Sequence, residues 1–207
     1  MNTYKSCLIF VLLAPLVIAL NAAQSAPEFL AKYNFENIPV YVPDWGAGHG
    51  STYKPATGWK TPFKVSLDSA NPHAGENALR FELIESSEKE KLVHGPAIQI
   101  SAPADGAVGE RKLLVHLFVR SSGITGKGVG VRLLERDEKN ASIRLLGNKT
   151  SLIPVPDSAD WVELEAEGAL HSRTRSVTLM IVAYQAEVPA TIWIDDVSVE
   201  LAPASAR

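Results

Sequence analysis

Two groups of side chains in this 207-residue chain have the character of ligand-recognition groups. The first lies between Pro39 and Pro62, where Trp45, Tyr53 and Trp59 stand among several glycines and prolines. A connection of this length is uncommon in a compact domain, and long aromatic loops are often functional. We predict a functional loop here, in which Trp45 is the most exposed ring because Asp and Gly flank it.

The second group comes from alternation along predicted strands, because successive side chains of a strand point to opposite faces. The strands concerned are Leu113–Arg120, Gly128–Glu135 and Ser176–Tyr184. Each has an apolar set on one face, and the opposite faces carry His116, Phe118, Arg132 and Tyr184. We expect these four side chains to lie together on one sheet face, as a mixture of aromatic, imidazole and cationic groups.

The elements that position these residues are predicted to be β-strands throughout. Short runs rich in Val, Ile, Leu and aromatic residues are separated by turn residues, and no helical period extends over three turns. The remaining runs are 32–36, 63–67, 78–83, 97–101, 142–146, 161–165 and 191–201. This pattern predicts an all-β protein, an antiparallel two-sheet β-sandwich of the jelly-roll type.

The N-terminus predicts export. Lys5 precedes an apolar run from Leu8 to Leu20, which is too short for a bilayer of ~30 Å but matches a signal peptide. Small residues favour cleavage after Ser25, with cleavage after Ala26 or an uncleaved anchor as alternatives. We expect a secreted or periplasmic protein with no membrane span after cleavage, divided into a signal peptide (1–25), a jelly-roll domain (26–201) and a flexible tail (202–207).

Composition and spacing exclude several kinds of chemistry. The 23 acidic and 20 basic residues leave no basic footprint for nucleic acid. The single cysteine, Cys7, lies in the predicted leader, so the mature chain has no thiol for a disulfide, a metal or a nucleophile. The five histidines lack zinc-site spacing. The glycine-rich segment 123–130 lacks the phosphate-loop pattern and is predicted to be a connection between two strands.

Several short motifs occur in a definite order between Tyr33 and Leu201. They are Asn34-Phe35-Glu36, Gly58-Trp59, the turn and strand of 71–81, Asp160-Trp161-Val162 and the last strand from Trp193 to Val199. Their order resembles that of the CenC-like carbohydrate-binding modules, which are jelly rolls of the galactose-binding-like superfamily. The resemblance implies a non-catalytic module that binds carbohydrate. The sequence lacks the spread of aromatic residues typical of a platform for crystalline polysaccharide, so we expect the ligand of this exported protein to be a soluble glycan chain or chain end.

The resemblance also implies a structural calcium ion that ties the N-terminal segment to the last strand. Calcium takes several oxygen ligands, including carboxylates and backbone carbonyls. The matching positions are Glu36 and Asp195, with backbone oxygens expected in 73–77 and Asp196 as the alternate carboxylate. The alternative is that Asp195 and Asp196 are ordinary strand-end acids, one of them satisfied by backbone amides.

A sugar site implied by the resemblance would use aromatic stacking and hydrogen bonds to hydroxyl groups. It would lie on the concave sheet face or at the loop apex, and the candidates are His116, Phe118, Arg132 and Tyr184 on the face and Trp45, Tyr53 and Trp59 in the loop. Trp59 and Trp161 are also candidates for the core, and Trp193 for packing. The expected partner is a polysaccharide or oligosaccharide, and a partner glycoside-active enzyme is not identified.

Two other functions are compatible with the sequence. One is a structural or protein-interaction β-sandwich of the cell envelope. The other is a small jelly-roll polysaccharide lyase or hydrolase, for which His116 would be the base and Arg132 the charge-stabilising cation. Asp195 and Asp196 are adjacent in a strand and face opposite ways, so they cannot flank one glycosidic bond.

Overall fold

The computed structural model describes residues 28–36, 41–42, 47–48, 52–53, 63–83, 93–103, 111–146 and 156–203. All regular elements within these ranges are strands, which confirms the all-β prediction. The strands are β1 (Glu28–Tyr33), β2 (Tyr41–Val42), β3 (Ala47–Gly48), β4 (Thr52–Tyr53), β5 (Phe63–Asp68), β6 (Ala78–Leu83), β7 (Val93–Ser101), β8 (Arg111–Arg136), β9 (Ser142–Leu145), β10 (Val162–Ala169) and β11 (Ser176–Pro203). The described residues contain no helix long and apolar enough to span a membrane.

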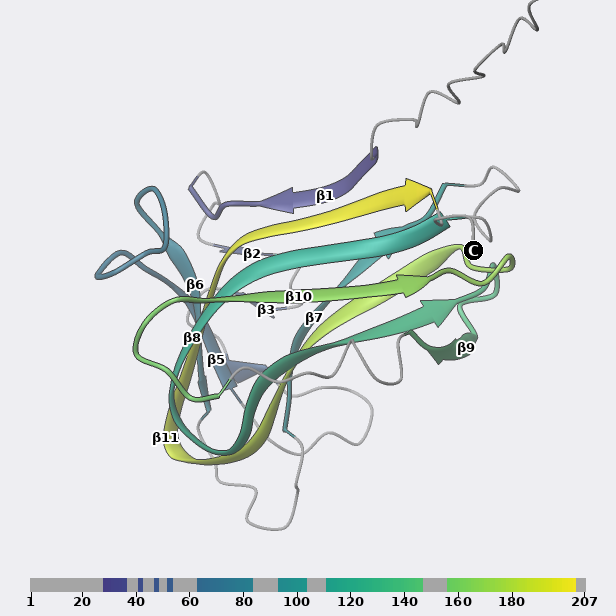
Figure 1. Ribbon diagram of the computed structural model, residues 1–207. Coiled ribbons are helices and arrows are strands. Elements are labelled where there is room, and N and C mark those ends of the chain that lie inside the picture. Colours follow the sequence, from purple (N-terminus) through teal and green to yellow (C-terminus); the bar gives the residue numbers. More distant parts are fainter. Residues whose placement is uncertain are drawn as a thin grey trace, which may run out of the picture.

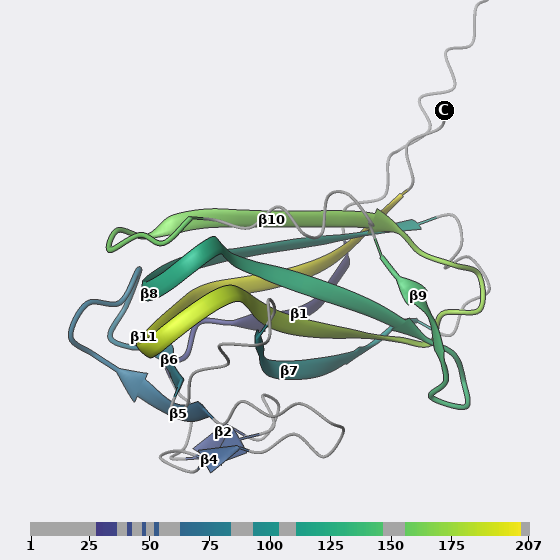
Figure 2. The same ribbon diagram turned by 90° about the horizontal axis from the view of Figure 1, so that it is seen from below.

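Two long strands, β8 and β11, pair antiparallel along most of their length and bend side by side (Figures 1 and 2). The bend gives each strand two arms. We call one of the two layers the first layer. It contains the arm of β8 before the bend, which pairs with β10, and the arm of β11 after the bend, which pairs with β6 and β1. From β6 the sheet continues through β5 to β4. The second layer holds the other two arms, flanked by β9 and β7. The antiparallel two-layer sandwich is therefore confirmed.

The bend explains one difference from the sequence prediction. The glycine-rich segment expected to connect two strands is part of β8, which continues from Arg111 to Arg136. Gly123 and Gly128 have φ values of +83° and +106°, in the region that glycine enters without steric cost. The chain can therefore change direction while Ile124 remains opposite Ala186 of β11.

The core lies between the two layers and is built by the predicted apolar faces. Leu113, Val115, Leu117 and Val119 are at most 2% exposed, and the corresponding residues of the other arms join the same cluster. One charged residue, Glu135, shares this inward face. Its fully buried carboxylate accepts hydrogen bonds from the Arg144 Nε (2.8 Å) and the His171 backbone N–H (2.8 Å), as a buried charge requires.

Candidate functional site

The bend in β8 separates the four residues that were expected to share a face. His116 and Phe118 lie on the arm in the first layer, whereas Arg132 lies on the arm in the second layer. Both arms turn their apolar faces into one core, so their polar faces point outward on opposite sides of the sandwich. The shared face was therefore a wrong prediction, as was the pairing of His116 with Arg132 as base and cation. Tyr184 lies opposite Gly128 near the bend, and its side chain is outside the described residues.

The loop candidates fall mostly outside the described residues. Trp45 and Trp59 are not among them, and Tyr53 is described only as part of β4, where it pairs with Phe63 of β5. Their role in stacking remains a prediction.

The N-terminal segment, the turn 73–77 and the last strand meet at one place, which we call the corner. The Glu36 carboxylate accepts hydrogen bonds from the backbone N–H of Glu76 (2.8 and 2.9 Å) and of Asn77 (3.2 Å). Gly75 has φ +65°, and a Cβ at this position would overlap the Glu36 carboxylate. Only glycine fits this approach of the turn to the carboxylate.

Asp195 lies at the same corner and is fully buried. Its Oδ2 accepts hydrogen bonds from the backbone N–H of His73 (3.0 Å) and Ala74 (3.3 Å), and its Oδ1 accepts one from Asp196 (2.8 Å). Burial raises the pKa of the Asp195 carboxyl, and the negative charge of Asp196 adds to this effect, while the three amide hydrogen bonds oppose it.

The backbone at the corner adopts the left-handed region at three places. Phe35 has φ +58° and Asp196 φ +47°, in addition to Gly75. This conformation is uncommon for residues with a side chain, and for a bulky one it is strained. Phe35 is fully buried in the core, which holds the strained backbone in place and directs the next residue, Glu36, toward the turn.

The turn 73–77, where backbone oxygens were expected as calcium ligands, directs the backbone N–H groups of His73, Ala74, Glu76 and Asn77 toward the two carboxylates. Glu36 and Asp195 bring two carboxylates from distant parts of the chain to one turn, and each carboxylate oxygen has lone pairs beyond those used by the amides. The negative charge of Asp196 acts unfavourably on the charged Asp195 carboxylate, so a cation would relieve this repulsion. The amide hydrogen bonds also satisfy the carboxylates by themselves, which is the alternative stated above.

Aromatic and cationic side chains interleave on the outer face of the first layer. The Arg120 guanidinium lies 4.2 Å from the ring centroid of Trp193 and 5.3 Å from that of Trp161, and Arg80 lies 5.8 Å from Trp193. Both indoles are half-buried on this outer face. The core candidacy of Trp161 was therefore wrong, whereas Trp193 does pack, against arginine side chains. Sequence alternation gave no sign of this cation–π cluster.

Asp68 anchors that cluster. It accepts hydrogen bonds from the Trp193 Nε1–H (2.7 Å) and the Ala70 N–H (2.9 Å). Burial by itself raises the pKa of the Asp68 carboxyl, but these hydrogen bonds and the charges of Arg80 and Arg120 outweigh it, so the pKa is lowered overall.

Phe118 connects the outer face to the corner. The His73 imidazole stacks on its ring with 3.5 Å between centroids and 13° between planes, and the His73 Nδ1 lies 2.7 Å from the Asp196 Oδ2. His73 also meets the edge of Trp161 at 5.8 Å. One side of the Phe118 ring is therefore covered by the protein, and Phe118 supports the turn.

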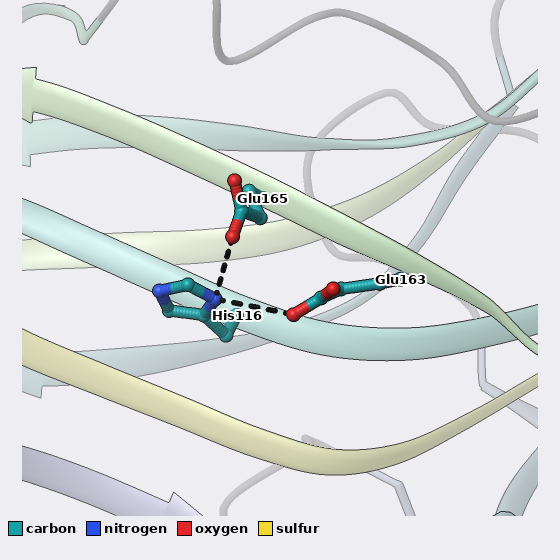
Figure 3. A group of neighbouring side chains, drawn as sticks. All are labelled: His116, Glu163 and Glu165. Atoms are coloured by element: carbon teal, nitrogen blue, oxygen red, sulfur yellow. Dashed lines mark ion pairs between the residues drawn. The ribbon is translucent and has the colours of Figure 1, made fainter.

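A shallow hollow of about 430 Å³ lies on the same outer face, between β8 and β10. Its outward-facing lining consists of Lys112, Leu114, His116, Glu165 and Glu167. The Lys112 Nζ pairs with the Glu167 Oε2 at 2.9 Å. The His116 Nδ1 lies 3.2 Å from the Glu165 Oε1 and 3.6 Å from the Glu163 Oε1 (Figure 3).

The glutamates of β10 are functional candidates that the sequence interpretation missed. Glu163, Glu165 and Glu167 alternate along one strand, so their common face was readable from their spacing. The strand that faces them was not readable, because the pairing of β10 with β8 joins residues about 50 positions apart along the chain.

Comparison with known proteins shows similarity in structure alone. No family model matches the sequence, and no curated protein matches it. Solved structures do match. One is the CBM22-1 xylan-binding domain of Xyn10C from Paenibacillus barcinonensis, with 14% identity, a TM-score of 0.55, and coverage of 87% of this chain and 98% of that chain.

Two further matches differ in what they do. The CBM22-1–GH10 modules of xylanase 10B from Clostridium thermocellum, complexed with xylohexaose, give 14% identity and a TM-score of 0.51 over 83% of this chain and 28% of that one. The Stig cyclase Fisc from Fischerella sp. TAU gives 14% identity and a TM-score of 0.56 over 87% of this chain and all of that one. Identities this low establish a common fold, which carries unrelated functions. The chain has the jelly-roll β-sandwich fold of carbohydrate-binding modules.

Proposed function

We propose that this protein is an exported, non-catalytic module that binds a neutral glycan chain or chain end on the outer face of its first layer. The observation that carries the proposal is the hollow between β8 and β10, which offers an apolar floor with hydrogen-bonding groups around it. The fold supports the proposal, since carbohydrate-binding modules share it.

The lining of the hollow matches the two surfaces of a sugar ring. Leu114 offers an apolar contact for the C–H face of the ring. Glu165 and Glu167 accept hydrogen bonds from hydroxyl groups, whereas Lys112 donates them. Hydrogen bonds to charged groups are stronger than neutral ones, which favours this mixture over uncharged groups.

The charge of the face selects a neutral glycan. Glu165 and Glu167 line the hollow with Lys112 as the opposing cation, and Glu163 lies on the same face of β10. An acidic polysaccharide would meet a row of carboxylates, and like charges at this separation repel.

The stacking component of the proposal depends on the loop aromatics. His73 covers one side of Phe118, and Arg120 lies over Trp161 and Trp193. Trp45, Tyr53 and Trp59 are therefore the rings we assign to sugar stacking. Tyr53 lies on β4, which β11, β6 and β5 separate from the hollow, so stacking there requires a glycan chain that extends beyond the hollow. Alanine variants at Trp45 and Trp59 test the two tryptophans individually.

The direct test is retention of the mature protein on neutral and acidic polysaccharides in affinity electrophoresis or on a glycan array. We expect retention by a neutral glycan, and loss of it in Leu114→Glu, which adds a negative charge to the floor of the hollow. Glu138→Gln, in the exposed turn after β8, is the matched control and retains binding. No retention of folded protein on any glycan would contradict the proposal.

The same protein variants and glycans also distinguish the proposed function from the other candidate functions. Appearance of new chain ends during incubation would identify a polysaccharide-cleaving enzyme. Retention of binding in Leu114→Glu together with its loss in Trp45→Ala would move the site from the sheet face to the loop. A folded protein that binds no glycan but captures an envelope protein would indicate the interaction module.

We also propose that a structural calcium ion is held by Glu36 and Asp195 at the corner. The support is the convergence of two carboxylates, one fully buried, on one turn, beside the strained backbone of Phe35 and Asp196. Calcium would supply a cation to this anionic site and would tie the first strand to the last. Isothermal titration of EDTA-treated protein with Ca²⁺ tests it, with Asp195→Asn as the variant expected to lose the binding.

A further inference from the structure

The side chains of His116, Glu163 and Glu165 form a cluster at the edge of the hollow, and two of them, His116 and Glu165, also line it. Their ligand-type atoms all lie within 4.8 Å of one another (Figure 3). His116 comes from β8, and the two glutamates come from β10 at positions i and i+2, so they share one face. Glu165 stands directly opposite His116 in the ladder, which fixes the cluster on two paired strands instead of a loop.

The two separations that involve His116 match metal coordination better than hydrogen bonding, and the two glutamate oxygens lie within 4.8 Å of each other. The His116 Nδ1 lies 3.2 Å from the Glu165 Oε1 and 3.6 Å from the Glu163 Oε1. An N–H···O hydrogen bond spans roughly 2.7–3.2 Å, so these separations are at or beyond its limit. Ligand atoms placed roughly 2.0–2.2 Å from one tetrahedral zinc ion are about 3.4 Å apart.

The charges at the cluster also favour a cation. Two carboxylates and one imidazole lie together here, within 4.8 Å of one another. The nearest lysine on this face, Lys112, pairs with Glu167 at 2.9 Å. Carboxylates this close repel each other unless a positive charge lies between them.

We propose that His116, Glu163 and Glu165 bind a divalent transition-metal ion, with Zn²⁺ as the representative and Cu²⁺ and Ni²⁺ as related ions. Imidazole nitrogen suits these metals, and carboxylate oxygens complete the set. Three protein ligands leave a fourth position open, and the exposed side chains (38%, 53% and 66% for His116, Glu163 and Glu165) give an ion access from solvent. The site does not depend on the calcium proposal, and it shares His116 and Glu165 with the lining of the hollow.

The experiment titrates Zn²⁺ into the full mature protein by calorimetry in a buffer that contains Ca²⁺, so that oxygen-rich calcium sites are already filled. We expect one equivalent of Zn²⁺ to bind. His116→Gln, Glu163→Gln and Glu165→Gln should each weaken binding by at least about tenfold. His171→Gln and Glu200→Gln, which alter a histidine elsewhere and a glutamate on the same outer face, should bind as the wild type does.

Spectroscopy identifies the ligands independently of affinity. The Cu²⁺-loaded wild-type protein should show an electron paramagnetic resonance signal with coupling to one nitrogen, and His116→Gln should lose that coupling. Circular dichroism and thermal melting confirm that the variants are folded. The proposal is overturned if no one-equivalent binding occurs, or if folded His116→Gln binds Zn²⁺ as tightly as the wild type.

Discussion

The corner and the hollow both contain histidine and carboxylate side chains, but these side chains have different roles at the two places. At the corner, His73 pairs with Asp196, and Glu36 and Asp195 accept backbone amide hydrogen bonds. At the hollow, His116 faces carboxylates that are more than half exposed. The comparison teaches that burial and backbone amides commit a carboxylate to holding strands together, whereas exposure on a rigid sheet leaves it available to a ligand.

The comparison predicts that corner variants lose stability and that hollow variants lose binding without losing stability. The largest effect is expected for Asp195→Ala. Three backbone N–H groups would be left without their acceptor, and each buried orphan costs about 1–3 kcal/mol. We expect the free energy of unfolding in urea to fall by about 3–5 kcal/mol. A loss below about 1 kcal/mol would show that the amides find other partners.

Gly75→Ala should have the next largest effect. The new Cβ would overlap the Glu36 carboxylate, and alanine is disfavoured at φ +65°. We expect a loss of about 1–3 kcal/mol in urea unfolding. In the double variant with Glu36→Ala, the overlap is gone, so only the backbone strain of Gly75→Ala should still lower the free energy of unfolding. If the losses of the two single variants instead add fully in the double variant, the packing explanation is wrong.

The pH dependence of the free energy of unfolding should differ in sign between the protein with calcium bound at the corner and the protein without it. In EDTA, the pKa of Asp195 is raised above its ordinary 3.8 by burial. The stability it contributes is therefore fully present below pH 3.8 and is lost as the pH rises through the folded-state pKa, with a slope of up to about 1.4 kcal/mol per pH unit. Bound calcium requires the charged carboxylate and should reverse this sign.

The measurement compares urea unfolding of the wild type and Asp195→Asn across pH, in EDTA and in Ca²⁺. The difference between the two proteins reports on Asp195 and on its interaction with Asp196, and cancels the groups that titrate alike in both. Identical difference curves in EDTA and in Ca²⁺ would exclude a calcium ion at this carboxylate.

The smallest stability effect is expected at the hollow. Glu165→Gln and His116→Gln alter two exposed side chains that pair with each other on the sheet surface. Their free energies of unfolding should stay within about 0.5 kcal/mol of the wild type. A larger loss in urea unfolding would mean that the cluster stabilises the β8–β10 pairing and would erase the contrast with the corner.

Much of the fold follows from local patterns. The alternation in Leu113–Arg120 predicted both the strand and its buried face, because a period of two is a local property of the chain. The bounds of β6 also agree with prediction, at Ala78–Leu83.

The candidate site was less predictable because it depends on long-range geometry. Alternation placed His116 and Arg132 on non-core faces correctly but could not reveal that β8 bends between them. Likewise, the sequence contains Glu163 and Glu165 at a readable spacing, but their meeting with His116 depends on strand pairing across about 50 residues. The convergence of Glu36 and Asp195 on the 73–77 turn was expected from family resemblance, and the structure brings these segments together.

The passage of β8 and β11 through both layers has a consequence for how the molecule comes apart. Neither layer has a central pair of strands of its own, since both pairs are continuations of the same two ribbons. Unfolding of one layer would disrupt the β8–β11 pairing that continues into the other layer. The sandwich should therefore unfold in a single cooperative step. Amide protons on the two arms of β8 should then exchange with solvent at similar rates, through the same global opening.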